Sequence, residues 1–175
     1  LENDPNAAKV DLLTGNFSGY AWAANAGWIS LGTNQLRTDT MHCLDSDSDA
    51  ISDAWELEQF DNISTAGVGT DQDGDGQSDA TEYIARTDPQ DADSYLKIIA
   101  HSYNGDQTEV TLEFASNSSR IYTIEQTDDL LNPDSWSDSG LGQMIGASGS
   151  TTRSFAIPGT TKRYFRIQAQ RPLNE

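Results

Sequence analysis

Apolar and polar residues alternate in several short segments of the second half of the chain. In Glu109–Phe114, the apolar residues Val110, Leu112 and Phe114 are separated by polar ones. Alternation with a period of two predicts a half-buried strand. Similar segments lie between clusters of Gly, Asn, Asp and Ser at Tyr95–Ser102, Ile121–Glu125, Thr152–Ile157 and Arg163–Gln168. Short strands at this spacing predict a small antiparallel β-sandwich within residues 94–175.

Residues 1–44 contain a separate aromatic pattern. Aromatic and β-branched residues flank Asn25–Gly27, which predicts the turn of a β-hairpin. A lone hairpin is marginally stable in water. We therefore expect Trp22 and Trp28 to pack on another part of the chain or on a partner chain; a sugar-binding platform is the alternative. Trp55 and Trp136 are expected to pack in the core.

Residues 45–93 favour helix in two short stretches, Asp53–Phe60 and Asp79–Arg86. The Asp that begins each stretch is a suitable N-cap, and Pro89 follows the second stretch as a stop. The predicted fold is thus mainly β. It has an N-terminal hairpin segment (1–44), a region of loops with two short helices (45–93) and a C-terminal β-sandwich (94–175).

Charge is concentrated in the middle region. The 175 residues carry a net charge of −18. Residues 45–93 contribute −14 of it, since they hold 15 acidic residues against one basic residue, Arg86. A surface this acidic repels phosphates, so we expect no nucleic-acid partner. We also expect no membrane span, because no apolar run reaches the required length.

The acidic region contains one motif twice, beginning at Asp45 and at Asp71. Both copies follow D-x-D-x-D-[GA]-x-x-D-x-x-E. The acids occupy positions 1, 3, 5, 9 and 12 of an EF-hand-type calcium loop, in which position 7 adds a backbone carbonyl. The predicted calcium ligands are Asp45, Asp47, Asp49, Ile51, Asp53 and Glu56 in the first loop, and Asp71, Asp73, Asp75, Gln77, Asp79 and Glu82 in the second.

The two copies make chance an improbable explanation, although a solvated acidic face is the simpler alternative. Ca²⁺ takes about six to eight hard oxygen ligands, more than Mg²⁺, and neither loop offers Zn²⁺ a His or Cys. Position 6 requires a sharp turn, which Gly76 permits. Ala50 stands there in the first loop, so that site is expected to be strained and slightly weaker.

Three further acids follow the second loop, Asp88, Asp91 and Asp93. They are candidate ligands for a third ion, and a polar linker is the alternative. No long amphipathic helix precedes either loop, so each is half an EF-hand. A calmodulin-like switch opens paired helices, and the expected role of at least two Ca²⁺ ions is therefore structural.

The region 45–93 resembles the thrombospondin type 3-like calcium repeats of secreted bacterial proteins. The resemblance rests on both loops, on Trp55-Glu56 and on Glu82-Tyr-Ile-Ala-Arg-Thr-Asp-Pro89. The β segment that follows is also similar to that family in Tyr122–Leu130 and Tyr164–Ile167. The resemblance implies an extracellular, calcium-stabilised module without catalytic activity.

Enzymatic chemistry finds little support in the sequence. The chain has two His, His42 and His101, a single cysteine, Cys43, and no Gly-x-Ser-x-Gly motif. We expect a secreted structural protein of the bacterial cell surface, self-associating as a subunit of a filament, appendage or coat. The alternative is a polysaccharide- or ligand-binding module of a larger secreted enzyme or adhesin.

Overall fold

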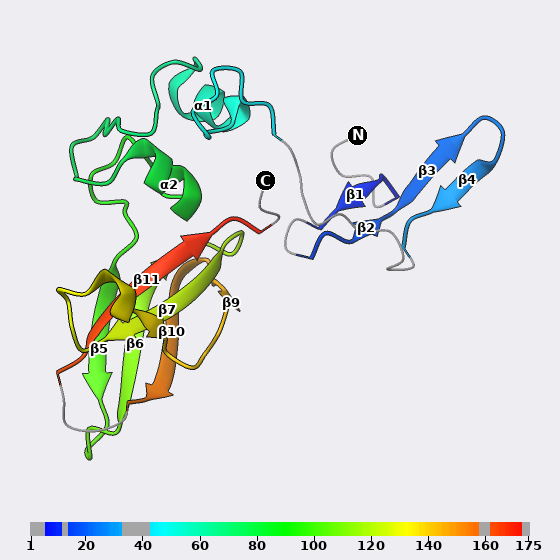
Figure 1. Ribbon diagram of the computed structural model, residues 1–175. Helices are drawn as coiled ribbons and strands as arrows, with labels where there is room; N and C mark the ends of the chain where they lie inside the picture. The colour runs from blue at the N-terminus through cyan, green and yellow to red at the C-terminus, as the bar shows by residue number, and fades with distance from the viewer. Residues whose placement is uncertain (1–5, 12–13, 33–42, 158–161, 173–175) are drawn as a thin grey trace. The chain divides into compact units, whose positions relative to one another are not determined.

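The computed structural model describes residues 6–11, 14–32, 43–157 and 162–172, and the fold is mainly β, as predicted. The chain divides into two compact units, Leu1–His42 with Pro172–Glu175, and Cys43–Arg171 (Figure 1). The second unit contains both the acidic region and the β-rich segment, and His42 lies outside the described residues.

Two antiparallel sheets form the β-rich part of the second unit. The first sheet has the order β10-β6-β5, and in the second β7 pairs with β11, β8 and β9. The strands are β5 (Ile98–Tyr103), β6 (Glu109–Ser116), β7 (Ile121–Thr127), β8 (Ser137–Asp138), β9 (Met144–Ile145), β10 (Gly149–Ala156) and β11 (Tyr164–Gln170), with a short 3₁₀ helix η1 (Pro133–Ser135) before β8.

One apolar core lies between the two sheets. Buried side chains from β6 and β10 of the first sheet meet those from β7 of the second, as in the contact of the Phe114 and Tyr122 rings at 5.4 Å. Phe165 and Ile167 of β11 pack against this cluster. Because alternate side chains of each strand enter one shared core, the arrangement is the predicted β-sandwich. Strand β5 lies at an edge of its sheet with all six residues exposed.

Two short helices, α1 (Asp53–Phe60) and α2 (Asp79–Ala85), occupy the acidic region. The prediction that an Asp caps each helix was wrong, since the N-caps are Ser52 and Ser78, one residue earlier. The carboxylates of the two Asp residues hold the preceding loops instead. No helix among the described residues has the length and apolarity needed to cross a bilayer.

A small apolar cluster joins the two helices. Ile51, Trp55, Ala66 and Tyr83 are all buried in it, and the Trp55 and Tyr83 rings lie 5.3 Å apart. The burial of Trp55 confirms the prediction that it is a core residue. This cluster unites the two loop–helix repeats into one body, because it takes side chains from both.

The N-terminal unit contains two small antiparallel ribbons. One pairs β1 (Lys9–Val10) with β2 (Phe17–Ser18), and the other pairs β3 (Tyr20–Ala23) with β4 (Gly27–Ser30) in the predicted hairpin. Trp22 and Trp28 face each other across the hairpin and are 62% and 72% exposed.

The second unit begins and ends at one place. The Arg171 guanidinium donates a hydrogen bond to the Cys43 sulfur at 3.6 Å, and it also stacks on the Tyr83 ring. Residues 128 positions apart therefore lie together where the chain enters and leaves this unit.

Candidate metal centre

Each acidic loop brings three carboxylates together. The groups are Asp45, Asp47 and Asp49 in the first loop and Asp71, Asp73 and Asp75 in the second. In each group, one oxygen of every carboxylate lies within 4.8 Å of the others. These are positions 1, 3 and 5 of the predicted loops, and each group could hold a metal ion.

The first Asp of each loop shapes the turn through hydrogen bonds from backbone amides. Asp45 accepts from Ser48 and Ala50, and Asp71 accepts from Gly74 and Gly76 in the same way. The third Asp of each loop accepts from the amide two residues later, at Ile51 and Gln77. These hydrogen bonds thus recur at equivalent positions of the two repeats, although the Asp49 amide donates to Asp45 and the equivalent Asp75 amide donates to Asp73.

Six carboxylate oxygens of the two loops are buried and have no hydrogen-bond partner. They are Asp49 Oδ2, Glu56 Oε1 and Oε2, Asp73 Oδ2, Asp75 Oδ2 and Glu82 Oε2. The Glu56 and Glu82 side chains, at loop position 12, are 0% and 1% exposed. A buried charged oxygen without a partner is strongly unfavourable. These oxygens are therefore suited to bind a cation.

Glu56 and Glu82 interact electrostatically with the triads, although neither belongs to the groups of oxygens within 4.8 Å. Burial raises the pKa of Glu56 to about 7, and the negative charges of Asp47 and Asp49 add to this rise. Burial likewise raises the pKa of Glu82 to about 7, with a further contribution from Asp73 and Asp75. A divalent cation between triad and glutamate would reverse both effects, because it stabilises the ionised carboxylates.

The Asp at position 9 braces its loop. Asp53 accepts hydrogen bonds from the Ser46 amide at 2.7 Å and from the Ser46 hydroxyl at 2.6 Å, which lower its pKa. Asp79 accepts from the Gln72 amide and the Thr70 hydroxyl. Both oxygens of each carboxylate are thus engaged within the protein. The role of Asp53 and Asp79 as direct calcium ligands stays a prediction. Their hydrogen bonds with Ser46 and Thr70 were not predicted from the sequence.

The two loops differ in backbone strain. Positions 4 and 6 have positive φ in both, at Gly74 (+76°) and Gly76 (+94°) in the second loop. The first loop has Ser48 (+64°) and Ala50 (+73°) there. Non-glycine residues in this conformation cost roughly 1–2 kcal/mol each. The strain at Ala50 was predicted from the sequence. The positive φ at Ser48 was not predicted.

The three acids of the candidate third site do not form a carboxylate group like those of the two loops. Within the described residues, Asp88, Asp91 and Asp93 belong to neither carboxylate triad. Asp88 and Asp91 each accept a hydrogen bond from the amide two residues later, as in ordinary turns. The backbone carbonyls of Ile51 and Gln77 remain predicted ligands, and the Ile51 side chain lies in the apolar cluster.

The donor set fits a hard cation. The side chains of both triads are carboxylates, and so are Glu56 and Glu82. Thr87 fixes one oxygen of Glu82 through a hydrogen bond of 3.1 Å. Such oxygens suit Ca²⁺ or Mg²⁺ better than softer metals. Comparison of the chain with protein-family models, curated proteins and solved structures gives no match.

Proposed function

We propose that this chain is a calcium-binding structural protein without enzymatic activity, in which Ca²⁺ holds together the two loop–helix repeats. One observation carries the proposal: buried carboxylate oxygens without partners recur at equivalent places in both loops. Protonation would remove their charge, but it would leave the repeated geometry unexplained.

The choice of Ca²⁺ over Mg²⁺ rests on ligand number and loop length. Three Asp, a Glu that chelates through two oxygens and a backbone carbonyl can provide the six or more oxygens that Ca²⁺ takes. Mg²⁺ keeps several waters and needs near-ideal octahedral geometry, for which a site with this many carboxylates is poorly suited.

Calcium binding is tested by calorimetric titration and by thermal unfolding. Chelation should lower the melting temperature strongly, since an ion that binds only the folded state contributes about 4 kcal/mol at a thousandfold excess over Kd. Asp75→Asn should weaken binding at the second loop. The matched control Asp106→Asn removes an exposed acid in the turn between β5 and β6, outside the acidic region, and should bind normally. An unchanged melting curve in chelator would refute the structural role.

The setting we propose is the bacterial cell surface, where the protein self-associates into a filament, appendage or coat. Support comes from the resemblance to thrombospondin type 3-like repeats, from the exposed Trp pair of the hairpin and from the open edge of β5. An unpaired strand edge can accept a further strand from another chain. Sedimentation and electron microscopy in calcium test this proposal, and a strict monomer at all concentrations would reject it.

A carbohydrate-binding module is the second candidate, and the exposed Trp22–Trp28 pair favours it. Residues 12–36 contain no Asp, Glu, Lys, Arg or His, so the hairpin offers aromatic surface without charge. A glycan array should then give saturable binding that is lost in Trp22→Ala and retained in the control Trp136→Phe. Absence of binding to any glycan would dismiss this alternative.

A further inference from the structure

The two calcium loops differ in what holds the helix that follows them. A peptide carbonyl in the last turn of a helix has no intrahelical partner. In α2, the Glu82 carbonyl accepts from the amides of Arg86 and Thr87. The next two carbonyls, those of Tyr83 and Ile84, need donors from elsewhere.

Arg120 supplies these donors from the sandwich. Its Nε donates to the Ile84 carbonyl at 2.6 Å and its Nη2 donates to the Tyr83 carbonyl at 3.0 Å. Its Nη1 donates to the Ser119 carbonyl and hydroxyl. The residue is 8% exposed. All these acceptors are neutral oxygens, so the buried guanidinium has no carboxylate partner among these hydrogen bonds. It lies instead at the carboxyl end of α2, where a positive charge is favourable.

The two carbonyls that Arg120 binds belong to the two residues directly after Glu82. Since α2 has seven residues, fixing its last-turn carbonyls also fixes the backbone that carries the Glu82 carboxylate. In α1, the corresponding residues after Glu56 are Leu57 and Glu58, and the Leu57 carbonyl accepts the amide of Asp61 at the C-cap. Arg86 contacts the exposed Glu58 carboxylate of α1, and the Gln90 side chain donates to the Gln59 carbonyl in the last turn of that helix. Among the described residues, none of the hydrogen bonds of Arg120 goes to α1.

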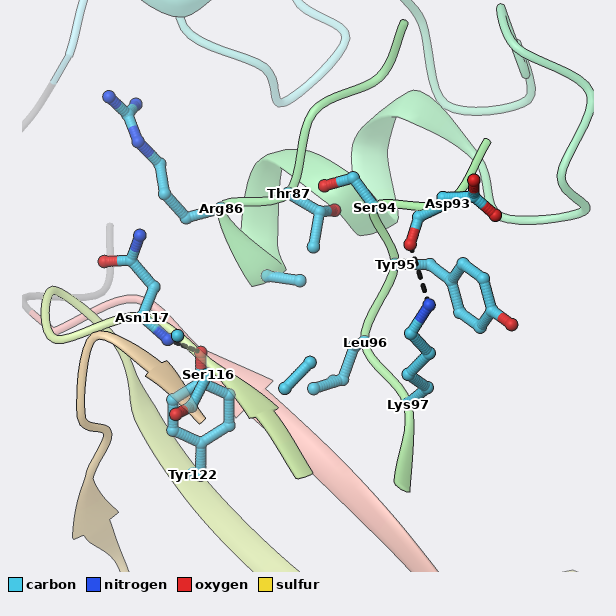
Figure 2. A pocket seen from close by; sticks show the side chains of 13 residues that line it. Arg86, Thr87, Asp93, Ser94, Tyr95, Leu96, Lys97, Ser116, Asn117 and Tyr122 are labelled. Atoms are coloured by element: carbon cyan, nitrogen blue, oxygen red, sulfur yellow. Dashed lines mark hydrogen bonds between the residues drawn. The ribbon is translucent and has the colours of Figure 1, made fainter. Parts of the chain in front are cut away.

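The surroundings of this contact are built from both parts of the second unit. A cavity of about 190 Å³ lies at the junction, lined by Arg86 and Thr87 after α2 and by Asn117 and Tyr122 of the sandwich (Figure 2). The Tyr122 hydroxyl accepts the Asn117 amide at 2.8 Å, which fixes the turn that presents Arg120. The guanidinium is thus bound by carbonyls of α2 on one side and by Ser119 of the sandwich on the other.

We propose that Arg120 is a positioning residue for the second cation site, acting through α2 on Glu82, and that it has no such effect on the first site. The inference rests on the proposed calcium function. Coupling between two binding events is reciprocal. Calcium at the second loop therefore also tightens the contact of α2 with the sandwich.

Two single-site backgrounds separate the effects. Glu56→Gln disables the first loop and leaves the second to be titrated, and Glu82→Gln does the reverse. In each background, Arg120→Lys retains the charge but loses the planar fork, and Arg120→Met retains only the stem. Calcium affinity is measured by calorimetry, and folding is checked by circular dichroism. Arg166→Met is the matched control, because it removes a sandwich cation whose partners are Glu125 and Trp136.

At the second loop, Arg120→Lys should weaken Kd by about fivefold or more, within the usual range of couplings between sites. At the first loop it should change Kd by less than about twofold, and Arg166→Met should have no selective effect. Equal weakening at both loops, or none at the second, would overturn the inference. If the Glu56→Gln protein binds no calcium before Arg120 is changed, the proposed function fails, and the positioning role fails with it.

Discussion

The carboxylates of the two loops fall into two kinds by what occupies their oxygens. Asp53 and Asp79 are fully engaged by loop hydroxyls and amides, whereas Glu56 and Glu82 carry buried oxygens without partners. The first kind stabilises the loop whether or not a cation is present. The second kind is unfavourable without one, so residues of the same charge have opposite effects in the calcium-free protein.

This division predicts how the calcium-free protein responds to pH. The pKa values of Glu56 and Glu82 are raised from 4.5 to about 7 in the folded state. The folded protein thus retains protons that the unfolded chain has lost, and their contribution is full below about pH 4.5 and disappears as the pH rises through about 7. In chelator, the melting temperature should fall from pH 5 to pH 8.

The double variant Glu56→Gln with Glu82→Gln is the control for this prediction. It should remove most of the fall, because neither side chain then titrates. In saturating calcium the dependence should reverse, since protons compete with the cation for the same oxygens. A melting temperature that rises with pH in chelator would contradict the assignment.

Backbone strain in the loops gives a second test. Replacing Ala50, at φ +73°, by Gly should raise the free energy of unfolding in calcium by about 0.5–1 kcal/mol, the relief of left-handed strain less the added chain entropy. Gly76→Ala should lower it by a similar amount, because Gly76 has open space around it and only the backbone resists. Chemical denaturation measures both, and changes of the same sign would disprove the explanation.

At the level of elements, the sandwich depends on a close approach at Gly146. A Cβ there would lie 2.5 Å from the Tyr122 ring and 2.7 Å from the Asn117 carbonyl. Gly146→Ala should therefore destabilise the fold by about 1–3 kcal/mol through overpacking. Gly105→Ala, with nothing within 4 Å, is the control and should be nearly neutral. Equal melting temperatures for the two variants would contradict the packing argument.

Elements set by local pattern could be predicted from the sequence. Alternation located β6 and β7 to within a few residues, and the predicted first residues of the helices, Asp53 and Asp79, are those of α1 and α2. The predicted hairpin was confirmed, with its turn at residues 24–26, one residue earlier than predicted. Such features depend on residues close together in the chain, so their signals are present in short windows.

Features that depend on distant contacts were not predictable. Nothing in the segment around Arg120 indicates that its guanidinium binds carbonyls 36 and 37 residues away. Trp136 was expected in the core, yet it is half-buried beneath the Arg166 guanidinium at 4.4 Å. The two-residue strands β8 and β9 were missed because segments this short have no period.

For the whole molecule, the net charge of −18 describes mainly the acidic region 45–93. Two Ca²⁺ ions would cancel four of these charges. They would do so within the carboxylate triads, where the repulsion between negative charges is greatest. In chelator, raising NaCl from about 10 mM to 500 mM should raise the melting temperature, because the screening length falls from about 30 Å to a few ångströms.

In saturating calcium the same salt increase should have a smaller effect, since the closest carboxylates are already neutralised by the ions. Scanning calorimetry of the full chain measures both series. An equal salt response with and without calcium would show that the charge of the loops does not limit stability.

The contact between Cys43 and Arg171 has a consequence for the architecture of the chain. The unit of 129 residues, 43 to 171, has its two ends side by side, as an inserted domain does. Such a cassette can be exchanged for a short bridging peptide or grafted into an exposed loop of another protein, because neither operation has to span a distance. Any calcium site in the two loops would be transferred together with this unit.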